Sequence, residues 1–337
     1  MVATPSPVQA SGTPDPGPRT PDSGPIPVIF VLGATASGKS ALAVALARQF
    51  GGEVISADAM AVYRGMDIGT AKPTPAERQE VPHHLIDWLE PEDRCDVQRW
   101  FTAADACLRD IHARGHLPVV AGGSPLFTKA LWEGLSTGAP RDEALRARLE
   151  ARHAAEGGEA LLAELARVDP TYAAQRHAND CRRIVRALEV WTLTGKPYSS
   201  FHTTDGGQRP DLAPVKISLE WPREELYRRI GVRVDRMFAA GLVEEVRRLR
   251  GRLSPEAAQA VGYKELSDHL DGQGTLDEAR ARIAQGTRHL AKHQATWYRR
   301  FTDITWLPGD APDLLDRAAA LVAQAHHPPA KVDVRNR

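Results

Sequence analysis

The residues that decide the fold are 33–40, GATASGKS, which directly follow the apolar run VIFVL at 28–32. They match the phosphate-binding pattern G-x-x-x-x-G-K-[ST] at every fixed position. Glycines at 33 and 38 let the backbone fold tightly around an anion, and Lys39 adds a positive charge. The strong helix formers at 41–50 predict that the loop opens a helix, whose N-terminus also favours anions. The sequence therefore predicts a diphosphate-binding loop made of Gly33, Ala34, Thr35, Ala36, Ser37, Gly38, Lys39 and Ser40.

Ser40 stands where a hydroxyl group can hold Mg²⁺, so magnesium is the cofactor that this pattern predicts. The loop pattern indicates only that phosphate groups are bound. It does not show what the diphosphate is attached to.

Composition narrows the classes of protein to which the chain can belong. Of its 337 residues, 43 are basic and 43 are acidic, so no net field draws it to nucleic acid, and an RNA-binding surface must be a local patch. The three cysteines are widely spaced and form no C-x-x-C pair, which argues against a disulfide framework or a zinc finger. No apolar run reaches 18 residues, and no signal-peptide pattern is present. We expect a cytoplasmic protein with no membrane contact, and a monomer.

Apolar runs and helical stretches alternate along the first third of the chain. Strands are predicted at 27–32, 53–58 and 117–123, with helices at 39–50 and near 96–114. This order predicts an α/β fold, a parallel sheet with helices on both faces. Strand character returns at 215–219, followed by helices predicted at about 224–249 and 276–301.

Strand signals are missing from about 132 to 207, where helix formers dominate. We interpret this segment as a helical insertion in a phosphate-binding core formed by 26–131 and 208–325. Residues 1–25 are rich in Pro, Gly, Ser and Thr and predict a disordered extension, and 326–337 predict a frayed tail.

Asp58 follows the second predicted strand and should lie beside the phosphate loop, because ligands of such sheets bind beyond the carboxyl ends of the strands. A carboxylate there suits either an outer partner of Mg²⁺ or a general base that acts on a nucleophile. A third interpretation is that Asp58 only caps the next helix.

The surrounding segments resemble the tRNA dimethylallyltransferases, also called tRNA isopentenyltransferases. The matching run ADAMAVYRGMDIGTAKP at 57–73 contains the most specific part, 63–73, and further matches include VPHHLID at 81–87, GLVEEVRRL at 241–249 and AVGYKEL at 260–266. The resemblance covers roughly residues 27–306. It implies a P-loop NTPase-like fold and the transfer of a dimethylallyl group from dimethylallyl diphosphate to N6 of adenosine 37, beside the anticodon of tRNA.

The resemblance also implies roles for individual residues. Asp58 matches the carboxylate that accepts the N6 proton, and Arg233 matches an arginine on the diphosphate. Ser124 matches a position that lines the reaction channel and contacts tRNA. The other implied tRNA contacts are Asp58, Ala59, Met60 and Ala61 at the target base, and Arg146, Arg182, Arg183 and Arg186 in the helical insertion.

The helix near 282–301 interleaves basic and aromatic residues, a mixture suited to RNA. There we expect Arg288, Arg299 and Gln294, rather than the aromatic rings, to contact RNA. His83 and His84 are adjacent, so their side chains diverge, and we interpret them as structural rather than metal-binding.

Several positions depart from the family pattern. Ala59 and Ala61 replace the usual Ser and Gln, and Ser124 replaces Thr. Phe127 replaces a Tyr, which removes a phenolic hydroxyl, and His293 stands where Arg is usual. Asp58 and the diphosphate ligands are intact, so the same reaction is expected.

Three alternatives remain open at the level of sequence. A small-metabolite kinase would carry the same loop. An adenylate prenyltransferase that acts on a free nucleotide would share both the loop and the aspartate. A non-catalytic RNA-binding module would use neither for chemistry.

Overall fold

The computed structural model describes residues 24–135, 140–201 and 209–326. The expected N-terminal extension at 1–25 and tail at 326–337 lie almost entirely outside the described residues. In the described part of the chain, no helix is both long enough and apolar enough to cross a membrane.

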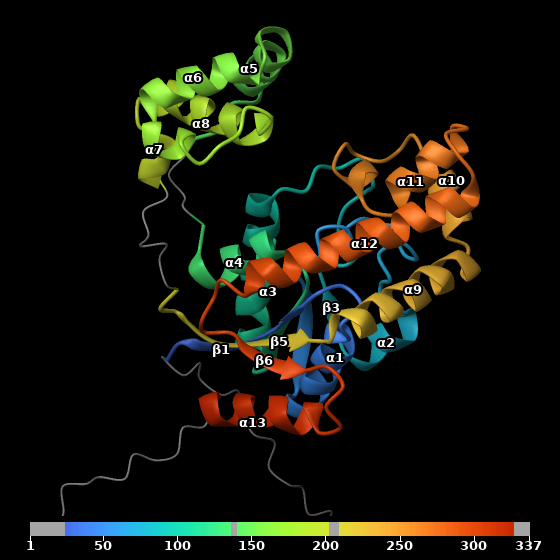
Figure 1. Cartoon of the computed structure of the whole chain (residues 1–337). Helices are drawn as coiled ribbons and strands as arrows, with labels where there is room; N and C mark the ends of the chain where they lie inside the picture. The colour runs from blue at the N-terminus through green and yellow to red at the C-terminus, as the bar shows by residue number, and fades with distance from the viewer. Residues whose placement is uncertain (1–23, 136–139, 202–208, 327–337) are drawn as a thin grey trace, which may run out of the picture.

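The centre of the molecule is a parallel sheet of six strands in the order β3-β2-β4-β1-β5-β6 (Figure 1). The strands are β1 (Ile26–Gly33), β2 (Gly52–Ser56), β3 (His83–His84), β4 (Leu117–Ala121), β5 (Leu212–Glu220) and β6 (Thr305–Pro308). The predicted α/β class with a parallel sheet is confirmed.

Alternate side chains of the strands bury themselves against helices on opposite faces, as period-2 strands between two helical layers must. Ile29 and Val31 of β1 pack with α1 (Lys39–Phe50) and α13 (Leu314–His326). Phe30 and Leu32 of the same strand pack with α3 (Val97–Ala113), and that core also reaches α4 (Pro125–Glu133).

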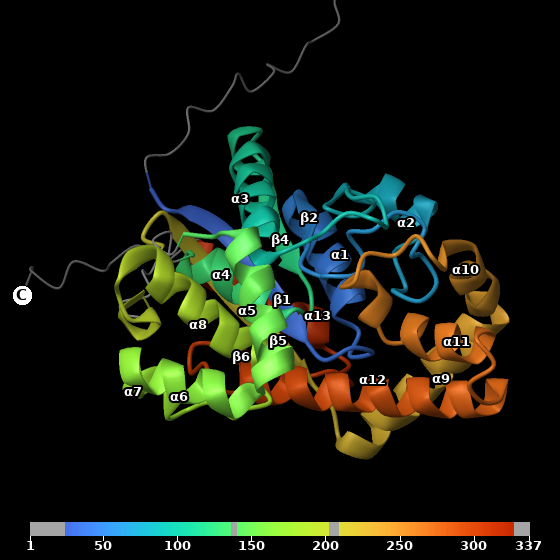
Figure 2. The same ribbon diagram turned by 90° about the horizontal axis from the view of Figure 1, so that it is seen from above.

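A second group of helices extends the layer of α3 and α4 beyond the sheet. It contains α9 (Arg223–Ala239), α10 (Leu242–Leu249), α11 (Tyr263–Leu270) and α12 (Leu276–Tyr298), with the short helix η2 (Ala257–Gln259) before α11. Helix α12 runs from α11 at one end to α4 at the other (Figures 1 and 2). Helix α2 (Pro75–Glu80) lies in the connection from β2 to β3, the strand at one edge of the sheet.

The prediction of one helix over 224–249 was wrong. The chain breaks between α9 and α10 at Gly241, whose φ of 97° is in the left-handed region that glycine adopts without strain.

The segment without strand signals forms a separate group of helices, set above the sheet in Figure 1. It comprises α5 (Glu143–Glu156), α6 (Gly158–Val168), α7 (Pro170–Ala173), α8 (Cys181–Thr194) and the short helix η1 (Tyr198–Phe201). These helices share a hydrophobic cluster of their own, which includes Leu149, Leu165 and Leu188. Ion pairs of Arg141 with Asp96 and of Glu143 with Arg94 join the group to the start of α3.

Candidate active site

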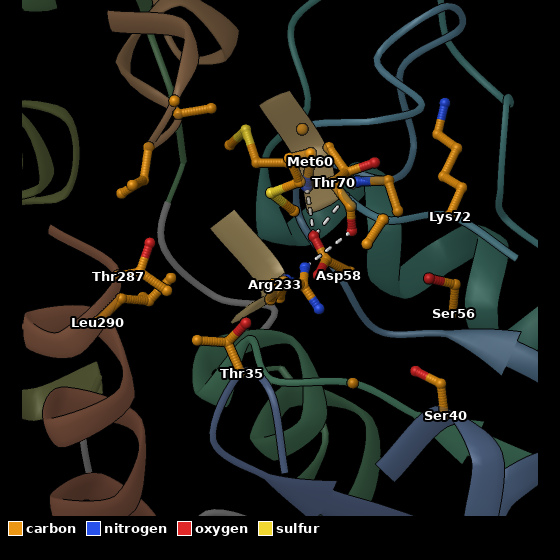
Figure 3. Close-up of a pocket in the computed structure, with 18 of the residues that line it drawn as sticks. Thr35, Ser40, Ser56, Asp58, Met60, Thr70, Lys72, Arg233, Thr287 and Leu290 are labelled. Carbon is orange, nitrogen blue, oxygen red and sulfur yellow. Dashed lines mark hydrogen bonds between the residues drawn. The ribbon is translucent and has the colours of Figure 1, made fainter. Parts of the chain in front are cut away.

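A cavity of about 170 Å³ lies at the carboxyl ends of β1, β2 and β4 and extends toward α9 and α12 (Figure 3). Its lining includes Lys39, Ser40, Asp58 and Arg233. Four predicted site residues from distant parts of the sequence therefore meet in one pocket.

The phosphate loop has the tight backbone that its glycines predict. Gly33 and Gly38 have φ values of 141° and 96°, and Ala36 also has a positive φ of 64°. A non-glycine residue in that region is strained by roughly 1–2 kcal/mol, so the surroundings must hold it there.

Two side chains from the far part of the chain hold this strained turn. Arg229 Nε of α9 donates to the Ala36 carbonyl at 2.9 Å. Trp221 Nε1 donates to the Ser37 carbonyl at 2.8 Å, and the Arg229 guanidinium lies over the Trp221 ring at 4.1 Å. Neither residue was singled out as a loop support from the sequence.

A third support is Gln294 of α12, which is only 6% exposed. Its Oε1 accepts a hydrogen bond from the Thr35 amide at 2.8 Å, and its Nε2 donates to the Gly123 carbonyl at 2.8 Å. Both polar groups of Gln294 are thus used inside the protein. RNA contact by Gln294 stays a prediction, but the pattern of α12 did not reveal that this side chain is buried against the phosphate loop.

Lys39 and Arg233 place two cations at the base of the pocket. Burial, and after it the positive charge of Arg233, lower the pKa of Lys39 to about 8, while Asp58 opposes the shift. Burial likewise lowers the pKa of Arg233, and Asp58 again acts in the opposite direction. Two partly desolvated cations that repel one another are arranged to receive a multivalent anion.

Asp58 lies beyond the end of β2, where the sequence predicts it. Its Oδ1 accepts hydrogen bonds from the amides of Met60 at 2.8 Å and Ala61 at 3.2 Å. The interpretation of Asp58 as a helix cap was wrong, because the chain turns here rather than entering a helix, and Oδ1 binds amides of that turn. These bonds fix the orientation of a carboxylate that lines the pocket.

Ser124 joins the two loops that follow β2 and β4. Its Oγ accepts a hydrogen bond from the Ala59 amide at 3.0 Å, and its own amide donates to the Ala57 carbonyl at 3.2 Å. At Gly122 a Cβ atom would lie 2.1 Å from the Ala57 carbonyl oxygen, so this close approach requires glycine. Ser124 therefore contacts the strip 58–61 directly.

The side of the pocket opposite Asp58 and the phosphate loop is mostly apolar, which the sequence could not show. It is built from α9, α10, α12 and the turn before α11 (Figure 3). The apolar side chains that contribute to it are Val234, Met237, Leu242, Val261, Ile283 and Leu290.

The predicted tRNA-contacting arginines divide into two kinds in the structure. Arg146 and Arg186 each donate to the same oxygen of Glu189 at 2.7 Å, and Glu189 is fully buried. Burial would raise the pKa of Glu189, but hydrogen bonds, first from Arg186, outweigh it and lower the pKa. Arg182 is exposed, and the Arg183 side chain is 61% exposed although it pairs with Asp180 at its helix start.

The pair His83 and His84 lies in β3. His84 Nε2 contacts Glu53 at 2.7 Å, and His83 Nδ1 contacts the Val81 carbonyl at 2.7 Å. Among the described residues, no cluster of three His, Cys, Asp or Glu side chains could hold a metal ion. The pocket lining includes the Ser40 hydroxyl and the Asp58 carboxylate, oxygen donors that suit Mg²⁺ when substrate phosphates supply most of the ligands.

Comparison with known protein families gives two matches. The family model described as IPP transferase matches residues 61–301, and the one described as isopentenyl transferase matches 26–94. Together they span the phosphate loop, the pocket and the helical group.

Individual proteins are similar over most of the chain. The tRNA dimethylallyltransferase of Roseiflexus sp. is 45% identical over 304 residues, which cover 89% of this chain and 98% of that protein. The enzyme of the same name from Thermomicrobium roseum is 47% identical over 284 residues, covering 83% and 85%.

Solved structures show the same likeness. The tRNA isopentenylpyrophosphate transferase of Bacillus halodurans is 38% identical with a TM-score of 0.65, covering 89% of this chain and 98% of its own. A eukaryotic dimethylallyltransferase described as acting on tRNA is 28% identical with a TM-score of 0.74, covering 89% and 78%.

Proposed function

The chain belongs to the IPP transferase family of tRNA dimethylallyltransferases, and from this membership and the pocket we propose which donor, acceptor and residues its tRNA modification uses. The donor is dimethylallyl diphosphate. The acceptor is N6 of adenosine 37, and diphosphate is the product released with the modified tRNA.

The observation that carries the proposal is that one cavity combines a phosphate loop, an oriented carboxylate and an apolar wall. The phosphate loop alone would serve any nucleotide. An apolar wall of aliphatic and thioether side chains suits a five-carbon prenyl group, whose burial contributes up to about 4 kcal/mol.

The leaving group is the first requirement of the chemistry. Breaking the allylic C–O bond leaves negative charge on diphosphate, and the amides of the loop, Lys39 and Arg233 surround the place where it forms. One preorganised contact of this kind lowers the barrier by about 3–4 kcal/mol. Mg²⁺ held beside Ser40 would neutralise part of the same charge.

The amine proton is the second requirement. The exocyclic amine of adenine is a weak nucleophile because its lone pair is conjugated with the ring, so its proton leaves as the new C–N bond forms. Asp58 is held with Oδ1 engaged by two backbone amides, and its carboxylate can accept that proton at the pocket. A positioned general base contributes roughly 10²–10⁴ in rate.

The target base must leave its stack to enter the pocket, a step that is easier in an anticodon loop than in a duplex. We propose that the helical group α5–α8 binds the RNA around the target base. Its exposed arginines Arg182 and Arg183 are available to phosphates, whereas Arg146 and Arg186 support the helices through Glu189.

The test is to incubate the protein with unmodified tRNA and dimethylallyl diphosphate and to analyse the nucleosides by mass spectrometry. Prenylated adenosine in tRNA is expected, and parallel incubation with AMP should give no prenylated product. Prenylation of AMP alone would favour a free-nucleotide enzyme. Tighter binding and hydrolysis of ATP, with no use of the prenyl donor, would favour a kinase.

A further inference from the structure

Glu245, in the first turn of α10, is a buried carboxylate with no part in the chemistry above. It is 2% exposed, and it faces the loop at 66–72 that forms one wall of the pocket. Its Oε2 accepts hydrogen bonds from the amides of Asp67 at 3.0 Å and Ile68 at 2.8 Å. Its Oε1 accepts from the Gly69 amide at 3.0 Å and from the Tyr263 hydroxyl at 2.6 Å.

Only a carboxylate satisfies this arrangement. Four donors converge on one side chain, and an ionised carboxylate offers about four lone-pair sites, whereas an amide offers two together with N–H groups that would face other donors. Three successive backbone amides around an anion also resemble the concave nests that proteins use to bind phosphate. Here the anion is the protein's own.

The loop that Glu245 holds is tightly packed and partly strained. A Cβ atom at Gly69 would lie 2.5 Å from the Tyr263 ring, so the backbone approaches the ring as closely as glycine allows. Ala71, two residues later, has a positive φ of 50°. Such a conformation persists only where its surroundings fix it.

The loop in turn contacts the site. Immediately after the three bound amides, the Thr70 carbonyl accepts a hydrogen bond from Arg233 Nη2 at 3.3 Å (Figure 3). Thr70 and Arg233 both line the pocket. A displacement of residues 67–69 would therefore move a carbonyl that orients this guanidinium group.

We propose that Glu245 is a positioning residue for the leaving-group step: by fixing residues 67–69 it sets the Thr70 carbonyl, which aims Arg233 at the departing diphosphate. The inference rests on the proposed role of Arg233. Glu245 itself touches no reacting atom.

A double-mutant cycle tests this chain of contacts. The proteins are wild type, E245Q, R233A and the double variant, with E244Q as the matched control because Glu244 is adjacent, 68% exposed and paired with Arg247. Initial rates give kcat and KM for dimethylallyl diphosphate at saturating tRNA, KM for tRNA, and the inhibition constant of inorganic diphosphate.

R233A should lower kcat/KM for dimethylallyl diphosphate about 10²–10³-fold. E245Q should lower it about tenfold and weaken inhibition by diphosphate, with KM for tRNA unchanged, since small displacements of a charged group are felt strongly in the transition state. In the R233A background E245Q should add less than about threefold, and E244Q should match wild type.

Losses that multiply in the double variant would overturn the role of Glu245 while leaving that of Arg233 intact. Normal activity of R233A would overturn both. If E245Q does not fold, Y263F replaces it in the cycle: it removes one donor from Glu245, should lower kcat/KM about threefold, and should add almost nothing to R233A. A Y263F loss that persists in full beside R233A would refute the proposal.

Discussion

Replacing Gln294 by alanine removes the tie between α12 and the phosphate loop. In the wild type, its amide accepts from the Thr35 N–H and donates to the Gly123 carbonyl, both at 2.8 Å and both buried. In Q294A these two backbone groups lose their partners, and each buried group left unsatisfied costs about 1–3 kcal/mol. Water can reach part of the site from the adjacent pocket, so the lower end applies, and we expect a loss of about 2–4 kcal/mol in the free energy of unfolding.

The same change should loosen the anion site. Thr35 belongs to the phosphate loop, and the hydrogen bond from its amide to Gln294 holds this part of the loop in place before diphosphate binds. Without this contact the loop must be ordered during binding, which costs affinity. We expect the affinity for dimethylallyl diphosphate to fall about tenfold, equivalent to about 1.4 kcal/mol.

Urea unfolding measures the first quantity and calorimetric titration of dimethylallyl diphosphate the second. K292A is the control, because Lys292 is exposed on the same helix two residues earlier. It should leave both quantities unchanged. The reasoning is refuted if Q294A keeps wild-type stability and diphosphate affinity and instead raises KM for tRNA, the result that an RNA-contacting glutamine would give.

D58N should bind dimethylallyl diphosphate normally but turn over at least about a hundredfold more slowly in single-turnover assays, and near-normal turnover would exclude Asp58 as the base. R183A should raise KM for tRNA and flatten its dependence on salt by about one counterion, with unchanged thermal stability; an unchanged salt slope would show that Arg183 faces elsewhere. R186A should lower the midpoint of thermal unfolding as well, because it leaves a buried carboxylate with one partner fewer, and a stable R186A with weaker tRNA binding alone would contradict the structural role. Hydrogen bonds, first from Arg114, lower the pKa of Glu53 to about 2, so the stability that the folded state gains from its ionised form is present above pH 4.5 and is lost as the pH falls toward 2. E53Q should be less stable than wild type by about 3 kcal/mol at pH 7, and the difference should shrink at pH 3; a gap that does not depend on pH would refute this.

The sequence predicts those parts of the site that depend on local pattern. The loop at 33–40 and the position of Asp58 after β2 follow from glycine spacing and from the rule that ligands lie at the carboxyl ends of parallel strands. The break at Gly241 could not be located from glycine alone, because Gly231 lies in the same helical pattern and stays inside α9.

What the sequence does not predict is which distant side chains turn inward. Glu245 and Gln294 stand among charged and polar neighbours on helices that look solvated, and only the packing of α10 and α12 shows that both are buried. Likewise, nothing local distinguishes Arg186, which binds buried Glu189, from its exposed neighbour Arg183. The shared fold and the family could be predicted from motifs, whereas the supports of the site required coordinates.

The bracing of the phosphate loop also bears on protein engineering. The side chains that hold its backbone stand 184, 193 and 259 positions away in the chain, at Trp221, Arg229 and Gln294. An octapeptide grafted from this enzyme into another scaffold would carry the glycines and the lysine. It would lack these three side chains, which hold the loop with Ala36 in a left-handed conformation. Anion binding by this loop therefore depends on the tertiary structure, and we do not expect the isolated peptide to transfer it.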